Sequence, residues 1–456
     1  MALLIRNGTV VNARDSASAD VLIRGDRIVQ IAPDLCASDA DEVIDASGCL
    51  VMPGFIDTHT HFDLDTGTAV TADDFASGTA AALLGGTTTV LDFATQEPGG
   101  SLADAFHEWM RKAQGSSCNY GFHIAIARFD DAVSAEMEYM RSLGVTSYKL
   151  YMVYDALRVD DGAIFRALKR ARELDSLVAV HCENYDLIRA LSRELHERGL
   201  QGDPASHVRS RPNEVEAEAV NRLIYIARLA EAPAYIVHLS TKEALLEVRR
   251  HRAAFAEPEV FVETCPQYLT LHDELYDADG RKYIMSPPLR KPSDAEALWD
   301  ALEDGNIDAI GTDHCSFTLA QKDAGAHDYA LVPNGIPGVQ HRVELMFSEG
   351  VLAGRCDPQK LVRLMAYNPA KLFGIRDRGV LASGAFADIT IWSPEGSRIV
   401  TDADNAYKCG YSPYSGMTVR GRVRDVILNG VHCVHDGELL QMGCGRYLAR
   451  GKSGAL

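Results

Sequence analysis

Histidine, aspartate and lysine residues stand at the ends of several apolar, strand-like segments of this chain. His59 and His61 directly follow one such segment, and residues two apart on a strand point to the same side. Neutral imidazole and carboxylate groups are good ligands for Zn²⁺ and similar divalent cations. The full set is His59, His61, Lys149, His181, His238 and Asp313. These residue types at strand ends predict a site for divalent metal ions.

The lysine of this set needs a chemical change before it can bind a metal. An ammonium group has donors and no lone pair, so unmodified Lys149 is no ligand. Addition of CO₂, which leaves the sequence unchanged, would give a carbamate able to bridge two metal ions. Two metals about 3.5–4 Å apart can share a water molecule and lower its pKa toward about 7. Each residue alone is more often structural, so the hypothesis depends on all six meeting at one place.

The middle of the chain alternates between apolar strand-like segments and helical patterns. The eight strand-like segments are residues 50–58, 87–93, 120–127, 147–152, 177–181, 234–239, 260–264 and 307–312. The clearest helix is predicted at residues 214–230, with Pro212 before it and acidic residues in its first turn. This α/β pattern is typical of a parallel (β/α)₈ TIM-like barrel, with a doubly wound open sheet as the alternative. In such a barrel the carboxyl ends of the strands meet on the face that carries active sites, so the six residues would converge there.

Both ends of the chain carry short alternating strands instead. They are predicted at residues 3–6, 9–11, 21–24, 27–31, 387–392 and 423–428, and the last precedes an Asn429-Gly430 hairpin signal. We therefore expect a small β-sandwich domain built from residues 1–50 and 374–456, the second part including a C-terminal tail. The metal-binding barrel would occupy residues 51–373.

Composition argues against several other classes of protein. The formal net charge is −19 over 456 residues, and no dense Lys/Arg block is present, so we expect no nucleic-acid partner. No apolar segment approaches the roughly 20 residues that span a bilayer, and residues 1–12 have the pattern of a strand rather than a signal peptide, so we expect no membrane association. The ten cysteines lack a CxxC pair or framework spacing, which is typical of free thiols and predicts a cytoplasmic location.

Around the strand-end residues the chain closely resembles the hydantoinase/dihydropyrimidinase branch of the amidohydrolase superfamily, with most likeness to the phenylhydantoinases. The matching motifs follow in family order over nearly the whole chain. They are GFIDTHTH at 54–61, TADDF at 71–75, GGTTT at 85–89, KLYMVY at 149–154, HCEN at 181–184, IVHLS at 236–240, ETCPQY at 263–268, SPPLR at 286–290, TDHC at 312–315 and PNG at 333–335.

The resemblance implies a two-metal centre with a role for each motif residue. His59, His61 and Asp313 would hold the more buried metal. His181 and His238 would hold the other, with zinc as the expected metal. Carboxylated Lys149 and a hydroxide would bridge the two ions.

The resemblance also implies how a substrate ring is bound and opened. Asp313 would carry the proton from the bridging water to the leaving nitrogen, and Tyr154 would donate a hydrogen bond to the oxyanion. Backbone groups at Ser286 and Asn334 would bind the amide edges of the ring. The reaction implied is metal-dependent hydrolysis of 5-substituted hydantoins, dihydropyrimidines or both to N-carbamoyl amino acids, by a homo-oligomer (a tetramer or dimer).

Three other functions stay open at this point. Dihydroorotases carry an arginine two positions after the HxH pair that binds the substrate carboxylate; here Asp63 stands there and would repel it. An allantoinase is a second alternative, and a non-catalytic scaffold of the same fold is a third. The scaffold relatives have lost metal ligands, whereas this chain keeps all six. Residues 62–67 and 155–159, which by resemblance line the pocket for the substituent outside the ring, depart from the common family pattern.

Overall fold

The middle of the chain forms an eight-stranded parallel sheet that curls into a nearly closed barrel. The computed structural model describes residues 2–255, 257 and 259–456. The strands neighbour one another in sequence order from β6 to β13. They are β6 (Phe55–Thr60), β7 (Thr87–Thr95), β8 (Asn119–Ala125), β9 (Ser147–Tyr151), β10 (Leu177–His181), β11 (Ala234–Ile236), β12 (Val260–Thr264) and β13 (Ala309–Ile310). The predicted (β/α)₈ barrel is confirmed, and each of the eight predicted segments contributes a strand.

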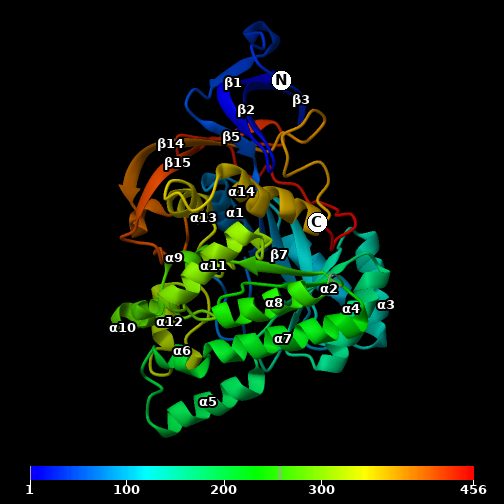
Figure 1. Cartoon of the computed structure of the whole chain (residues 1–456), viewed down its shortest axis with the longest axis vertical. Helices are drawn as coiled ribbons and strands as arrows, with labels where there is room; N and C mark the ends of the chain where they lie inside the picture. Colours follow the sequence, from blue (N-terminus) through cyan, green and yellow to red (C-terminus); the bar gives the residue numbers. More distant parts are fainter. Residues whose placement is uncertain (1, 256, 258) are drawn as a thin grey trace.

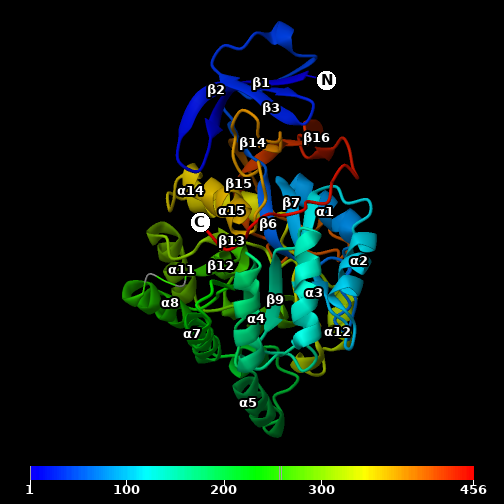
Figure 2. The same ribbon diagram turned by 90° about the vertical axis from the view of Figure 1, so that its right-hand side faces the viewer.

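Helices cover the outside of the barrel, and several begin at a capping aspartate. The covering helices are α1 (Phe75–Leu84), α2 (Leu102–Lys112), α3 (Asp131–Ser142), α4 (Asp161–Glu173), α7 (Asn213–Ala230), α8 (Lys242–Ala254) and α11 (Pro292–Asp304). Asp74, Asp130 and Asp160 each accept a hydrogen bond from the backbone N–H three residues later, which satisfies a free donor in the first turn. Figure 2 shows α3 and α4 beside β9. The helix predicted at residues 214–230 is α7.

The remaining helices lie in the connections between strands. They are α5 (Tyr185–Glu197), α6 (Ser206–Ser210), α9 (Pro266–Thr270), α10 (Tyr276–Asp279), α12 (Leu319–Ala324), α13 (Arg342–Met346), α14 (Pro358–Val362) and α15 (Asn368–Leu372). In Figure 1 helix α5 lies at the end of the molecule farthest from the chain's N-terminus. Among the described residues, no helix is both long enough and apolar enough to cross a bilayer.

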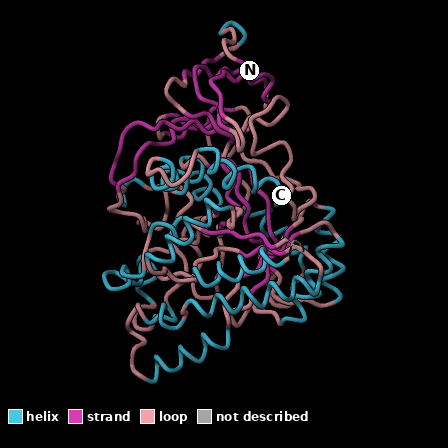
Figure 3. Tube along the Cα trace, viewed as in Figure 1, coloured by secondary structure: helices cyan, strands magenta, loops and turns pink. Residues whose placement is uncertain are grey.

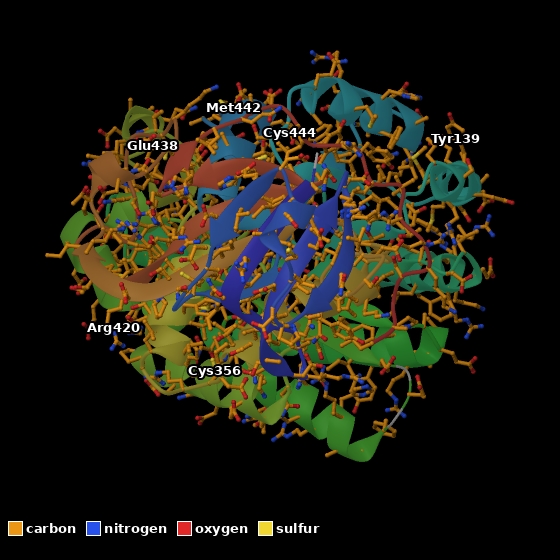
Figure 4. The ribbon with its side chains drawn as sticks, turned by 90° about the horizontal axis from the view of Figure 1, so that it is seen from above. Tyr139, Cys356, Arg420, Glu438, Met442 and Cys444 are labelled. Carbon is orange, nitrogen blue, oxygen red and sulfur yellow. The ribbon has the colours of Figure 1, made fainter. Side chains whose placement is uncertain are left out.

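The two chain ends build a separate β-domain, as predicted (Figure 3). Its strands are β1 (Ala2–Val11), β2 (Ser16–Arg24), β3 (Arg27–Ala32), β4 (Glu42–Asp45), β5 (Leu50–Pro53), β14 (Ile389–Ile399), β15 (Thr418–Leu428), β16 (Val431–His435) and β17 (Glu438–Leu439). Hydrogen bonds join all nine strands into one mixed sheet rather than into two separately bonded layers. Seen from above in Figure 4, the blue strands of the N-terminal part lie beside the orange and red strands of the C-terminal part.

The first predicted strand, residues 50–58, divides into two strands of different sheets. Residues 50–53 form β5, which pairs with β1 and β14 in the β-domain, and only β6 enters the barrel. The division falls at Gly54, where a Cβ would lie only 2.2 Å from the Thr88 hydroxyl oxygen. Only glycine lets the backbone at this position approach the Thr88 side chain so closely. The sheet of the chain ends therefore includes residues 50–53, and the boundary expected at residues 50/51 falls within β5.

The C-terminal tail runs across the amino ends of the barrel strands. Backbone hydrogen bonds join Tyr120 N–H to Arg446 O (2.9 Å) and Leu448 N–H to Tyr120 O (2.8 Å). The buried Arg450 guanidinium donates to the Phe122 carbonyl and, at 2.8 Å, to Ser147 Oγ. The tail thus closes the end of the barrel opposite the carboxyl ends of its strands.

Candidate metal centre and active site

A cavity of about 470 Å³ lies at the carboxyl ends of the barrel strands. The nine residues that the sequence singled out come from seven separate motifs of the chain, and all of them line this cavity. They are His59, His61, Lys149, Tyr154, His181, His238, Ser286, Asp313 and Asn334. The barrel topology brings together side chains that are up to 275 positions apart, from His59 to Asn334.

His59, His61 and Asp313 present three ligand atoms to one point. The Nε2 atoms of both histidines lie 3.1 Å from Asp313 Oδ1. All three ligand atoms lie within 4.8 Å of one another, and the set has the composition of a divalent metal site. Burial lowers the pKa of His59, but the Asp313 and Glu263 carboxylates outweigh it and raise that pKa to about 9. The surplus of negative charge around this imidazole favours a cation.

His181 and His238 form a second pair of facing ligand atoms. His181 Nδ1 lies 2.9 Å from His238 Nε2, and both side chains are buried. Two imidazole nitrogens that point at each other need a proton or a metal ion between their lone pairs. The donor set of this pair fits a second divalent cation.

Two buried carboxylates that the sequence reasoning missed orient these histidines. Glu263 accepts a hydrogen bond from His59 Nδ1 at 2.7 Å, and Glu183 accepts one from His181 Nε2 at 2.6 Å. Arg211 Nη1 donates to Glu183 at 2.7 Å. Carboxylates behind metal-binding histidines fix the ring orientation and make the imidazole a stronger ligand. The available signal was that each glutamate stands at the carboxyl end of a barrel strand.

Lys149 is buried in the same cavity between two aromatic rings. Its Nζ lies 5.2 Å from the ring centroids of both Phe93 and Tyr151. Burial lowers the pKa of Lys149 to about 8. A lower pKa leaves more of the neutral amine, and only the neutral amine has the lone pair that reacts with CO₂.

Three residues that line the cavity have a left-handed backbone conformation, which residues other than glycine rarely adopt. The φ angles are 73° at Tyr154, 39° at His238 and 54° at Asp313. Such conformations cost about 1–3 kcal/mol each and persist where surrounding structure imposes them. Each residue lies two or three positions after the end of a barrel strand, and its side chain lines the cavity.

The loops that carry Ser286 and Asn334 are held together by a buried lysine. Ser286 Oγ donates to Asn334 Oδ1 at 2.9 Å. Lys322 Nζ donates to the Ile284 carbonyl at 2.9 Å and to the Pro333 carbonyl at 3.0 Å. Lys322 therefore links the residues next to both predicted ring-binding positions, and nothing in its sequence context revealed this role.

Three loops line the outer part of the cavity. Two are the loops expected to do so, through residues 64–68 and through Ala156 and Leu157. The third, residues 95–98 after β7, was not expected. Asp63, on which the argument against a carboxylate substrate relied, is not among the lining residues; Asp65 and Glu97 supply the acidic groups there. An acidic wall that would repel a carboxylate is therefore present, and Asp65 and Glu97 form it in place of Asp63.

Comparisons with known proteins agree with this geometry. The amidohydrolase family matches residues 50–433 of the chain. A D-hydantoinase of Geobacillus stearothermophilus is 41% identical over 466 aligned residues, which cover 100% of this chain and 98% of the relative. A D-phenylhydantoinase of Escherichia coli O81 (strain ED1a) is 40% identical over 457 residues, covering 99% and 98%.

The fold agrees over the same length. The crystal structure of dihydropyrimidinase from Brevibacillus agri NCHU1002 matches with a TM-score of 0.97 at 39% identity and covers 100% of both chains. The family match extends over most of the chain, and the relatives match it from end to end. The chain is therefore a member of the amidohydrolase family and, within it, of the hydantoinase/dihydropyrimidinase group of cyclic amidohydrolases.

Proposed function

We propose that this cyclic amidohydrolase opens 5-substituted hydantoins and dihydropyrimidines to N-carbamoyl amino acids at a centre of two divalent cations. The supporting observation is that two groups of facing ligand atoms share one cavity with Lys149. His59, His61 and Asp313 would hold one cation. His181 and His238 would hold the other, and N6-carboxylated Lys149 would lie between them. Zinc suits this set of nitrogen and carboxylate ligands.

The proposed chemistry divides into tasks of the metals and tasks of the side chains. When bound, a pair of divalent cations supplies a nucleophilic water of lowered pKa and polarises the scissile carbonyl. The water oxygen forms a bond to the ring carbonyl carbon, and the Asp313 carboxylate accepts the proton that the water loses. As the C–N bond breaks, Asp313 delivers that proton to the leaving ring nitrogen.

Tyr154 donates a hydrogen bond to the carbonyl oxygen and stabilises the negative charge that develops there. Burial raises the pKa of Tyr154 well above its ordinary value, so the phenol remains a hydrogen-bond donor at neutral pH. A donor aimed at an oxyanion contributes about 2.7–4 kcal/mol to the transition state. The backbone at Ser286 and Asn334 binds the amide edges of the ring and sets its orientation.

The outer cavity favours a substituent without negative charge. Leu64 and Leu157 offer apolar surface there, while Asp65 and Glu97 are the acidic side chains of the same wall. A carboxylate at this point would meet like charges, which raises its binding free energy. We therefore propose alkyl- or aryl-substituted ureide rings as substrates, in preference to dihydroorotate.

Metal analysis combined with a substrate panel tests the proposal. The zinc-loaded protein should hold two ions in the barrel and open hydantoin, 5-phenylhydantoin and dihydrouracil faster than dihydroorotate. The double variant Asp65→Asn/Glu97→Gln should reduce the difference in ring-opening rate between the neutral rings and dihydroorotate. A metal-loaded protein that is inert on all neutral rings would refute the proposal.

The remaining expectations concern assembly and location. We also propose a homotetramer or dimer, since Leu440 and Met442 expose apolar side chains at the start of the tail that a second copy could cover. Figure 4 labels Met442 on this surface. All ten cysteines are free thiols, which supports a reducing compartment such as the cytoplasm. Light scattering on the zinc-loaded protein measures the assembly.

A further inference from the structure

A second cluster of metal-binding side chains lies in the β-domain, outside the catalytic cavity. Asp425 of β15 and His432 and His435 of β16 each offer one ligand atom, and the three atoms lie within 4.8 Å of one another. His432 Nε2 is 3.0 Å and His435 Nδ1 is 2.6 Å from the same oxygen, Asp425 Oδ1. A tetrahedral cation bound at about 2.0–2.1 Å would hold its ligand atoms about 3.3 Å apart, so the His432 nitrogen would move outward by about 0.3 Å and the His435 nitrogen by about 0.7 Å to admit it.

The strands themselves create this convergence. Asp425 and His435 are direct partners in the antiparallel β15–β16 ladder, so their side chains share one face of the sheet. The ladder has a register irregularity between Val426 and Ile427, opposite the β16 segment that carries His432. This irregularity brings His432 to the same carboxylate as His435. A regular ladder would not be expected to place two β16 residues three positions apart on one face.

The surroundings of the cluster have the features of a metal site. Glu42 Oε1 lies 3.0 Å from His432 Nδ1, and a carboxylate behind a metal-binding imidazole fixes its ring and strengthens it as a ligand. Arg424 Nε donates to the other oxygen, Asp425 Oδ2, and leaves Oδ1 to the two imidazoles. Asp425 is fully buried, whereas the His435 side chain is 54% exposed, so water molecules could complete the coordination of a cation bound here.

We propose that Asp425, His432 and His435 form a structural binding site for a divalent cation of the zinc type. Two imidazoles and one carboxylate select a first-row metal such as Zn²⁺ over Mg²⁺ or Ca²⁺, which prefer oxygen ligands alone. The site joins the two chain ends, because Glu42 belongs to β4 of the N-terminal part and the three ligands belong to the C-terminal hairpin. The cation would stabilise the β-domain and take no part in ring opening.

Zinc stoichiometry of the full-length enzyme tests this site. The wild type and a His432→Gln/His435→Gln variant are equilibrated with Zn²⁺, desalted, and analysed for metal and for ring-opening rate. We expect the wild type to retain one more Zn²⁺ per chain than the double variant, with equal rates. His107→Gln, a change at an exposed histidine on α2, serves as the matched control and should retain the wild-type content.

Two further variants separate binding from folding. His435→Gln alone changes a half-exposed side chain and should lower Zn²⁺ affinity at this site at least tenfold while the circular dichroism spectrum stays unchanged. Glu42→Gln, which removes no ligand, should weaken binding by about 10–100-fold. Equal zinc content in the wild type and the double variant overturns the proposal, as does a joint loss of zinc and ring-opening rate. An inactive enzyme with normal extra zinc would instead count against the proposed function alone.

Discussion

At the scale of single residues, burial sets the protonation state of the groups to which we assign roles in the reaction. The Lys149 amine has its pKa lowered to about 8 because it lies away from water between two aromatic rings. The same burial raises the pKa of the Tyr154 phenol, so it stays a donor. A partly neutral amine and a neutral phenol donor therefore line the same cavity, and the Tyr154 ring centroid lies 5.3 Å from that of His181. Both roles can be tested by single substitutions.

Lys149→Ala should lose bound metal and activity together. The substitution removes the side chain that we propose as a bridge between the two sets of histidines, and losing even an outer partner of a metal ligand costs about 10–100-fold in metal affinity. We expect at least a hundredfold lower kcat/KM, with metal content measured on the same sample. Lys169→Ala, at an exposed lysine on α4, is the control. Normal metal content in Lys149→Ala would contradict a bridging role.

Tyr154→Phe should reduce kcat while metal content stays at two ions in the barrel. The phenol is proposed to act on charge that develops only in the transition state, and removing such a donor costs about 10²–10³ in kcat. KM for a hydantoin should change little, because the ground-state carbonyl carries less charge. Steady-state kinetics with metal analysis decides the point. A change confined to KM would assign Tyr154 to substrate binding instead.

At the scale of elements, strand ends place the ligands and loops complete the site. The candidate histidine and aspartate ligands lie at or within three residues of the carboxyl ends of their strands, whereas Lys149 lies in the middle of β9; the left-handed backbone of His238 and Asp313 falls in the turns after β11 and β13. The loops that carry Ser286 and Asn334 have no such regular support. A side chain of helix α12, Lys322, holds them through two carbonyls.

Lys322→Met should change how stability depends on pH. Burial lowers the pKa of Lys322 to about 7, below the value of about 10.4 in an unfolded chain. Between these values the unfolded state binds more protons, so this lysine makes the free energy of unfolding rise with pH. The wild type should therefore gain stability over the variant from pH 7 to pH 10, by about 1 kcal/mol per pH unit. Urea unfolding at both pH values measures the free energies of unfolding of the wild type and the variant. A difference between them that does not change with pH would disprove the prediction.

At the scale of the whole molecule, the C-terminal tail covers the amino ends of the barrel strands, on the side opposite the cavity. The backbone of the tail bonds to residues just before several strands, including Gly144 and Asp175. The Arg450 guanidinium donates a hydrogen bond to the Phe122 carbonyl of β8. Strand β5 pairs with both β1 and β14, so the strands from the two chain ends belong to the same sheet.

Deletion of residues 446–456 should destabilise the barrel without altering the cavity residues. The deletion removes several backbone hydrogen bonds worth about 0.5–1.5 kcal/mol each and exposes the strand ends to water. We expect Tm to fall by at least about 5 °C. Differential scanning calorimetry compares this variant with a control that lacks only residues 455–456. These two residues are exposed, so their deletion should leave Tm unchanged. Equal Tm values for both deletions would show that the tail is dispensable.

The sequence by itself determined the barrel, the β-domain and the nine residues around the cavity. Apolar strands, capped helices and turn signals are local patterns, and a parallel barrel forces the carboxyl ends of its strands onto one face. His59, His181 and Asp313 could therefore be placed together from their positions at strand ends alone. The family motifs added Tyr154, Ser286 and Asn334, whose surroundings in sequence are otherwise those of ordinary turns.

Only the tertiary structure decided which partners hold these residues. Glu263 orients His59 from 204 positions away, and Asp65 and Glu97, rather than Asp63, form the acidic wall. The split of residues 50–58 between two sheets depends on strand pairing with β1 and β14. The pairing of His432 and His435 on one carboxylate needs a register irregularity. Such contacts join side chains distant along the chain, and a local pattern carries no information about a partner that only folding brings near.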